Sequence, residues 1–196
     1  MRLEPGFYER SNVAKIAREL LGKALYTQVD GVSSGGIIVE TEAYSWKERG
    51  CHAFGGKMTS RNEVMFRAGG HAYVYLCYGI HNLFNVVTNG EGLADAVLIR
   101  AIEPLQGIDA MKERRGKVKD PFQLTSGPGK LTKALGIDRS FNGKFLLNSE
   151  VWIEDVGEKV RSKHIAVTKR IGIDYAGKDA KLPWRFVVKG NSWISK

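Results

Sequence analysis

Several short stretches of the chain are rich in apolar, β-branched and aromatic residues and are bounded by turn residues, and this pattern predicts β-strands. The predicted strands cover residues 24–29, 36–44, 72–78, 83–88, 94–102, 151–154, 165–171 and 184–189. A Gly/Ser-rich turn over residues 30–35 joins the first two strands, and residues 79–82 are few enough to close a β-hairpin. Pro104 is expected to end the strand that precedes it.

Helical spacing of apolar residues occurs in four other segments. They are residues 13–21, 61–66, 105–115 and 131–135, the last of which ends before Gly136. Ser11 is the expected N-cap of the first helix; Thr59 or Ser60 is that of the second, where Glu63 completes a capping box. In the third helix Leu105, Ile108 and Met111 are expected to face inward. The mixture of strands and helices, without internal repeats, predicts an α+β fold. With 196 residues the chain is long enough for one domain, residues 1–196, with a proper core.

The overall composition is that of an ordinary globular protein, with 43% hydrophobic and 26% charged residues. No apolar run approaches the roughly 20 residues of a membrane span, so no membrane association is expected. The first residues lack the apolar core of a secretory signal, which predicts a cytoplasmic protein that is not secreted. Cys51 and Cys77 are too few for a disulfide framework and indicate a reducing compartment, although a single disulfide between them stays open.

Positive charge changes this picture more than composition does. The net charge is +9, and residues 157–196 hold ten Lys/Arg against three Asp/Glu. Residues 110–135 hold seven against two. Such an excess attracts polyanions, of which nucleic acid is the commonest, and the alternative is a merely basic globular protein.

The strand over residues 36–44 carries the first candidate chemistry. Period-two alternation places Glu40, Glu42 and Tyr44 on one face. A carboxylate beside aromatic walls can act as general base toward water, and two carboxylates about 6.5–7 Å apart along a strand could also suggest a sugar hydrolase. The alternative is that both glutamates only line a solvated strand face.

Other polar and aromatic residues allow both functional and purely structural interpretations. Tyr73, Tyr75 and Tyr78 crowd one predicted strand, where cross-strand aromatic packing is the alternative to a binding site. His52 has the alternative of an ordinary loop histidine. The cysteines and histidines lack the spacing of zinc ligands, so no metal site is expected.

Residues 126–130, Ser-Gly-Pro-Gly-Lys, superficially resemble a phosphate-binding loop. Leu124 stands where the first glycine of that motif belongs, and Leu131 stands where Ser or Thr follows the lysine. We therefore expect no nucleotide-triphosphate site. Lys130 at a helix N-terminus could still bind one backbone phosphate of a nucleic acid.

Several spaced motifs together resemble one protein family. They are Val-Glu-Thr-Glu-Ala-Tyr (39–44), His52, Thr-Ser-Arg-Asn (59–62), Tyr-Val-Tyr-Leu-Cys-Tyr-Gly (73–79), Asn85, Leu-Ile-Arg-Ala-Ile-Glu-Pro (98–104) and Ser-Gly-Pro-Gly-Lys-Leu (126–131). In this order they resemble the alkyladenine (3-methyladenine/methylpurine) DNA glycosylases over nearly the whole chain. The resemblance implies a curved antiparallel sheet with flanking helices and a protruding hairpin that wedges into DNA.

The resemblance also implies a reaction. Glu42 matches the general base that activates water against the anomeric carbon, and Arg100 matches the arginine that helps position Glu42 and that water. The Ile171 backbone carbonyl matches a further ligand of the water, whereas Glu40 matches no catalytic role. The implied enzyme is a monofunctional glycosylase that leaves an abasic site and needs no cofactor.

The remaining matches imply contacts with DNA. Tyr44, His52 and Tyr75 match the walls that enclose a base flipped out of the duplex, and Asn85 matches the residue that crowds the exocyclic amine of normal guanine. Tyr78 matches the wedge that fills the gap in the base stack. Thr59 and Lys130 are expected to contact DNA. The implied partner of this chain, which we expect to be a monomer, is double-stranded DNA with damaged purines.

Two other functions stay open at this point. One is a nucleic-acid-binding module without catalysis, against which an intact Glu42 and Arg100 argue. The other is a carbohydrate hydrolase, which the basic charge disfavours and which needs a second placed carboxylate. The resemblance leaves the damage spectrum open, because Ile80 and His81 at the hairpin tip depart from the family pattern.

Overall fold

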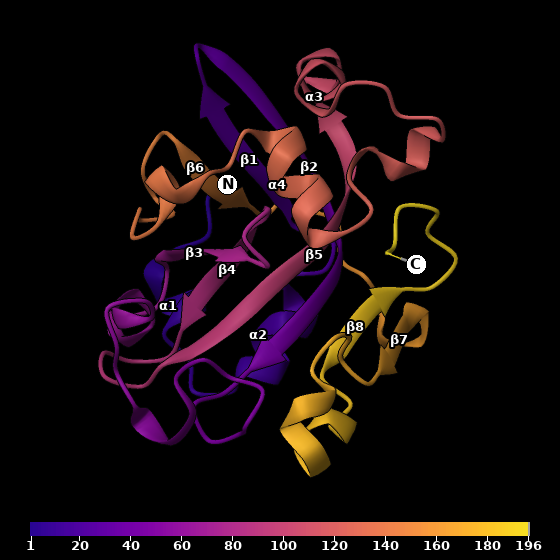
Figure 1. The fold of residues 1–196 in the computed structure, drawn as a ribbon. Coiled ribbons are helices and arrows are strands. Elements are labelled where there is room, and N and C mark those ends of the chain that lie inside the picture. Colours follow the sequence, from indigo (N-terminus) through magenta and orange to yellow (C-terminus); the bar gives the residue numbers. More distant parts are fainter. Residues whose placement is uncertain (196) are drawn as a thin grey trace.

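An antiparallel β-sheet is the framework of the protein in a computed structural model, which describes residues 1–195 (Figure 1). The strands are β1 (Ala24–Val29), β2 (Val32–Tyr44), β3 (Ala72–Cys77), β4 (His81–Thr88), β5 (Asp95–Gln106), β6 (Val151–Glu154), β7 (Ile165–Thr168) and β8 (Arg185–Val188). They lie in the order β3-β4-β5-β2-β1-β6, and β8 pairs with both β2 and β7. The α-helices are α1 (Pro5–Tyr8), α2 (Val13–Glu19), α3 (Ile108–Arg115) and α4 (Pro128–Leu135). These elements form a single α+β domain, as the sequence predicts.

Strand β2 is the centre of the sheet. Its residues 35–44 pair with β5 along one edge, while the other edge pairs first with β1 and then with β8. Glu40 and Glu42 therefore lie in the stretch that has β5 on one side and β8 on the other. Both side chains are fully buried, so the alternative of a solvated strand face is wrong.

The hydrophobic core covers both sides of this central strand. Helix α2 packs against β2, where the Thr41 hydroxyl donates to the Ala17 carbonyl at 2.7 Å. Helix α4 packs against β4 and β5, and its Leu131 is completely buried in the same core as Ile16 of α2. Because Glu40 and Glu42 both contact Arg100 of β5, they share the face opposite to Thr41, as the period-two pattern predicts.

Two hairpins illustrate how local sequence sets the sheet. The turn between β1 and β2 consists of Asp30 and Gly31 alone, both with positive φ, as a two-residue hairpin turn requires. The predicted turn over residues 30–35 is therefore wrong, because β2 begins at Val32. The β3–β4 hairpin ends in Tyr78 and Gly79, also at positive φ, and the Tyr78 side chain is 87% exposed.

The structure corrects the predicted end of the fifth strand. Strand β5 continues through Pro104, which pairs with Gly36, and ends only at Gln106. Because β4 pairs with β5 only as far as Leu98, Pro104 lies where β5 is no longer held on both edges, and proline is tolerated there. Consequently the helix begins at Ile108 and not at residue 105.

The predicted inward face of that helix is also largely wrong. Leu105 and Ile108 are 55% and 39% exposed, and only Met111 is fully buried. Leu105 belongs to β5, so its side chain follows strand geometry instead of the helical period.

Helix starts differ from the predictions as well. Asn12, and not Ser11, caps α2, since its side chain accepts from the Lys15 backbone N–H. Residues 63–66 form a 3₁₀ turn without a side-chain cap, so the predicted capping box is wrong. The Asn62 carboxamide oxygen instead accepts from the backbone N–H and the hydroxyl of Thr59.

The remaining elements agree with the prediction to within a few residues. Helix α4 begins earlier than predicted, at Pro128, and β7 ends at Thr168 instead of residue 171. Helix α1 and the 3₁₀ segment Asp174–Lys181 were not predicted. Cys51 and Cys77 are both free thiols. Within residues 1–195, none of the helices has the length and apolar character to cross a membrane.

Candidate active site

A cavity of about 690 Å³ opens where the β3–β4 hairpin, the end of β2, the loop before α4 and the segment after β7 come together. The structure brings eight of the ten predicted site residues to its lining: Tyr44, His52, Tyr75, Tyr78, Asn85, Arg100, Lys130 and Ile171. Glu42 lies fully buried behind this lining, bonded to three of its members. Thr59 is exposed and lies outside the lining.

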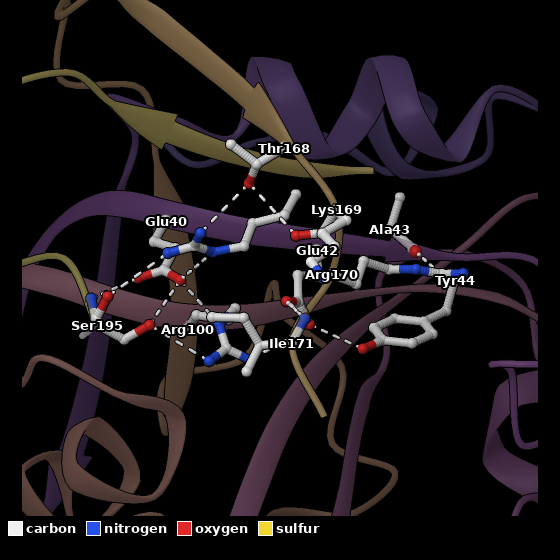
Figure 2. Close-up of polar contacts among 11 residues, drawn as sticks. Glu40, Glu42, Ala43, Tyr44, Arg100, Thr168, Lys169, Arg170, Ile171 and Ser195 are labelled. Atoms are coloured by element: carbon white, nitrogen blue, oxygen red, sulfur yellow. Dashed lines mark hydrogen bonds and ion pairs between the residues drawn. The ribbon is translucent and has the colours of Figure 1, made fainter. Parts of the chain in front are cut away.

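Glu42 is held by three donors from three parts of the chain (Figure 2). Its Oε2 accepts from the Tyr44 hydroxyl at 2.8 Å and from Arg100 Nη1 at 3.3 Å. Its Oε1 accepts from the Ile171 backbone N–H at 2.8 Å. These contacts fix both carboxylate oxygens of Glu42 beside residues that line the cavity.

Glu40 is bonded much more completely than Glu42. Its Oε1 accepts from Arg100 Nε at 2.8 Å, Arg185 Nε at 2.7 Å and the Ser195 hydroxyl at 2.7 Å, and its Oε2 accepts from the Ser195 backbone N–H at 2.6 Å. Burial acts to raise the pKa of Glu40, but Arg100 and the bonds from Ser195 and Arg185 hold this pKa below its usual value. Glu40 therefore accepts four hydrogen bonds from protein donors, three at Oε1 and one at Oε2, and its fully buried side chain does not line the cavity.

Arg100 links the two glutamates. It is 7% exposed, and each of its three guanidinium nitrogens has its own partner: Nε bonds Glu40, Nη1 bonds Glu42 and Nη2 donates to the Ser195 hydroxyl at 3.3 Å. Burial acts against its charge, but the two carboxylates outweigh it and raise the pKa of Arg100. Arg100 is therefore a fixed cation at the base of the cavity.

Aromatic rings form much of the cavity wall. The rings of His52 and Tyr75 lie 4.5 Å apart between centroids at an interplanar angle of 70°. His52 Nδ1 lies 2.8 Å from the Tyr73 hydroxyl, a contact that orients the imidazole. Burial, together with the charge of Arg61, lowers the pKa of His52 to about 4, so this histidine is neutral at physiological pH.

Tyr44 is supported from the side away from the cavity by a residue that the sequence did not reveal. The Arg170 guanidinium carbon lies 4.7 Å from the centroid of the Tyr44 ring, and Arg170 does not line the cavity. Arg170 forms a bidentate pair with Glu48, at 2.6 and 2.8 Å, and also donates to the Ala43 carbonyl. No local motif could have identified this pair, because its members lie 122 residues apart in the chain.

The other predicted residues occupy distinct positions. Asn85 is buried, and its Nδ2 donates to the Tyr73 carbonyl across the β3–β4 hairpin. Tyr78 stands at the exposed hairpin tip with φ of 50°, an uncommon conformation for a residue other than glycine. Lys130 lies in the first turn of α4. Within the described part of the chain, no group of three or more His, Cys, Asp or Glu side chains is placed to hold a metal ion.

Comparisons with known proteins agree with one another. The family model described as Methylpurine-DNA glycosylase (MPG) matches residues 6–192. A protein of Carboxydothermus hydrogenoformans is 50% identical over 196 residues that cover all of both chains, and one of Bacillus cereus (strain G9842) is 45% identical over 205 residues with the same full coverage. A protein of Desulfitobacterium hafniense is 43% identical, covering 99% of this chain and 98% of its own. All three carry the name "Putative 3-methyladenine DNA glycosylase".

Proposed function

Because this chain belongs to the methylpurine-DNA glycosylase family, we propose that it excises alkylated or deaminated purines from duplex DNA by hydrolysing their N-glycosidic bonds. The observation that carries the proposal is Glu42, a buried carboxylate fixed by Arg100, Tyr44 and Ile171 behind an aromatic cavity. A general base of this kind acts on water without a cofactor or metal.

The target nucleotide first leaves the base stack, because the glycosidic bond cannot be reached inside a duplex. Tyr78 is the candidate wedge, since it is 87% exposed at the tip of the β3–β4 hairpin. The extruded purine then enters the cavity between Tyr44 on one side and His52 and Tyr75 on the other. Asn85 lies at the same cavity and would crowd the exocyclic amine of guanine.

Hydrolysis follows at the anomeric carbon. Glu42 accepts a proton from a water as the water oxygen bonds to C1′, and the C1′–N bond breaks with its electron pair leaving on the purine. An alkylated cationic purine leaves as a neutral base, whereas a neutral purine needs a proton from a donor. Arg100 and the Ile171 backbone N–H hold Glu42 for this step. In the proposal the Ile171 backbone carbonyl is a further ligand of the water, and the step yields an abasic site.

Contacts with the rest of the duplex come from basic and polar residues around the cavity. Lys130 in the first turn of α4 is suited to a backbone phosphate, because charge and helix N-terminus act together there. Thr59 is exposed and remains a DNA contact in the proposal. The net charge of +9 supports DNA as the partner.

The two alternative functions receive less support. A carbohydrate hydrolase needs two available carboxylates, but Glu40 is fully buried outside the cavity lining and accepts four hydrogen bonds from protein donors. A binding module without catalysis gives no reason for three residues of the cavity lining to direct their donors at the single carboxylate of Glu42.

The proposal is tested by base release from duplex oligonucleotides that carry hypoxanthine, ethenoadenine or 7-methylguanine at one position. We expect free base from at least one of these duplexes and strand breaks only after alkali, as an abasic product requires. Release of the base, with strand breaks that appear only after alkali, supports hydrolysis by water. Breaks before alkali, with a borohydride-trapped protein–DNA adduct, would instead show an amine nucleophile. Binding of all three duplexes without release would favour the binding module.

A further inference from the structure

Ser195 belongs to the active site although it lies more than ninety residues from Arg100 in the sequence. Its hydroxyl donates to Glu40 Oε1 at 2.7 Å and accepts from Arg100 Nη2 at 3.3 Å, and its backbone N–H donates to Glu40 Oε2. The residue is 8% exposed and faces the cavity with Arg100 (Figure 2). One neutral hydroxyl thus bridges a buried anion and a buried cation.

Arg100 can meet Glu42 in only one orientation of its guanidinium. That group is planar with its donors in a fixed fork, so the directions of Nε and Nη2 determine where Nη1 points. Glu40 fixes Nε and Ser195 fixes Nη2. The bond from Nη1 to Glu42, at 3.3 Å the longer of the two that Arg100 makes to a carboxylate, is therefore directed by the Glu40 bond at 2.8 Å and by the Ser195 bond at 3.3 Å.

Glu40 also keeps the local charge balanced. Arg185 of β8 donates to the same Oε1 that accepts from Arg100, so two arginines face Glu40 and Glu42 in one buried cluster. Without the Ser195 bonds, Glu40 would be free to turn toward Arg185. Arg100 would then lose the anchor that directs its Nη1 at Glu42.

We propose that Ser195 and Glu40 are positioning residues that act through Arg100 to hold Glu42 in its reactive orientation, an inference that rests on the proposed function. Glu40 lies outside the cavity lining, and the Ser195 hydroxyl bonds to Glu40 and Arg100, so the proposal gives neither residue a contact with the reacting atoms. Their effect falls on the chemical step, because they set the geometry of the arginine that contacts the general base and not the shape of the cavity walls.

The segment that carries Ser195 is attached to the protein by other contacts as well. The Trp193 ring packs on Phe122 at 5.2 Å, and Asn191 accepts from the Trp193 backbone N–H while donating to Glu103. These contacts do not involve the buried cluster. Asn191→Ala is therefore a matched control that loosens the same segment without removing a bond to Arg100 or Glu40.

The test uses the full-length protein, with the lesion that the wild type releases fastest. Ser195→Ala is expected to lower the single-turnover rate about tenfold, the order of a lost hydrogen bond to a charged group, with binding of the damaged duplex unchanged. Asn191→Ala is expected to leave the single-turnover rate unchanged. Glu40→Gln, which weakens every anchor at once, should lower it further if the variant folds.

A double-mutant cycle distinguishes positioning from a general loss of structure. In an Arg100→Gln background, Ser195→Ala should have almost no further effect, because the residue it orients is gone. An equal loss in both backgrounds would overturn the proposal, as would a wild-type rate for Ser195→Ala or a loss explained entirely by a smaller active fraction. If the wild type itself releases no base, the proposed function fails instead, so the two failures are distinguishable.

Discussion

Two buried arginine–glutamate clusters lie next to the cavity, and they are built differently. Arg170 and Glu48 form a closed bidentate pair in which both carboxylate oxygens meet one guanidinium. Arg100 instead divides its nitrogens among Glu40, Glu42 and Ser195. The first arrangement satisfies two charges with each other, whereas the second spreads one cation over three partners.

This difference matches different roles, because the Arg170–Glu48 pair supports the cavity wall whereas the Arg100 cluster contacts the proposed general base. The Arg170–Glu48 pair does not line the cavity and packs behind Tyr44, so its role is to hold a wall. Arg100 lines the cavity and bonds to Glu42. Oε2 of Glu42 accepts two hydrogen bonds, and its Oε1 accepts one. Among Glu40, Glu42 and Glu48, Glu42 is the carboxylate whose three donors all line the cavity, and the proposal therefore assigns the proton transfer to it.

Removing the cation of the open cluster should produce the largest effect on activity. We expect Arg100→Gln to lower the single-turnover rate of base release by about 10²–10³-fold, because a preorganised charge beside the reacting groups is lost. Quenched-flow or manual single-turnover assays under enzyme excess measure this rate. A rate within about threefold of the wild type would show that Arg100 is structural, like Arg170.

Breaking the closed pair should instead affect stability. Glu48→Gln leaves the Arg170 charge buried without its partner, and we expect the free energy of unfolding to fall by about 3–5 kcal/mol, as for other broken buried pairs. Denaturant titration gives this value. Asp109→Asn, which removes the exposed Lys112–Asp109 pair, is the control and should leave the midpoint unchanged. A stable Glu48→Gln protein without activity would contradict the division between the clusters.

A smaller effect is expected from the hydroxyl that joins the wall to the general base. Tyr44→Phe keeps the ring against Arg170 but removes the donor to Glu42, and we expect about a tenfold slower chemical step with little change in DNA binding. Tyr75→Phe is the matched control, since its hydroxyl makes no hydrogen bond to Glu42. Equal losses in both variants would contradict a specific role for the Tyr44 hydroxyl.

The smallest effect concerns His52, which lines the cavity but belongs to neither cluster. Its folded-state pKa of about 4 lies below the unfolded value of 6.5, so between these pH values only the unfolded chain binds the proton. The stability that His52 contributes is therefore present above pH 6.5 and is lost as the pH falls toward 4. NMR titration of its ring protons should show a midpoint near 4, and a midpoint near 6.5 would contradict a buried neutral imidazole.

The sequence predicted the strands better than their ends. Short apolar and aromatic runs located the eight strands found within residues 1–195, because each strand buries one or both faces of the sheet. The strand ends were wrong at Pro104, where pairing with β2 extends β5 to Gln106, and in residues 30–35, where pairing with β1 begins β2 at Val32. The prediction of Thr59 as a helix N-cap also failed. The Thr59 backbone N–H donates to the Asn62 side chain, and this bond closes a loop and does not begin a helix.

The active site was predicted through its motifs and not through its packing. Four of the eight predicted residues that line the cavity lie on β2, β3, β4 and β5, which the sheet brings together, and the other four come from loops, the hairpin tip and α4. Arg185, Ser195 and the Arg170–Glu48 pair were missed. Their partners lie far away in the chain, and a lone arginine or serine carries no local pattern that distinguishes it from a surface residue.

The measurement that tests the central claim most directly is base release by Glu42→Gln compared with its binding of the same damaged duplex. The substitution keeps the size of the side chain and removes its capacity to accept a proton. We predict a single-turnover rate at least about 10³-fold below the wild type, with the dissociation constant changed by less than about threefold. Release at a near-wild-type rate would contradict Glu42 as the general base.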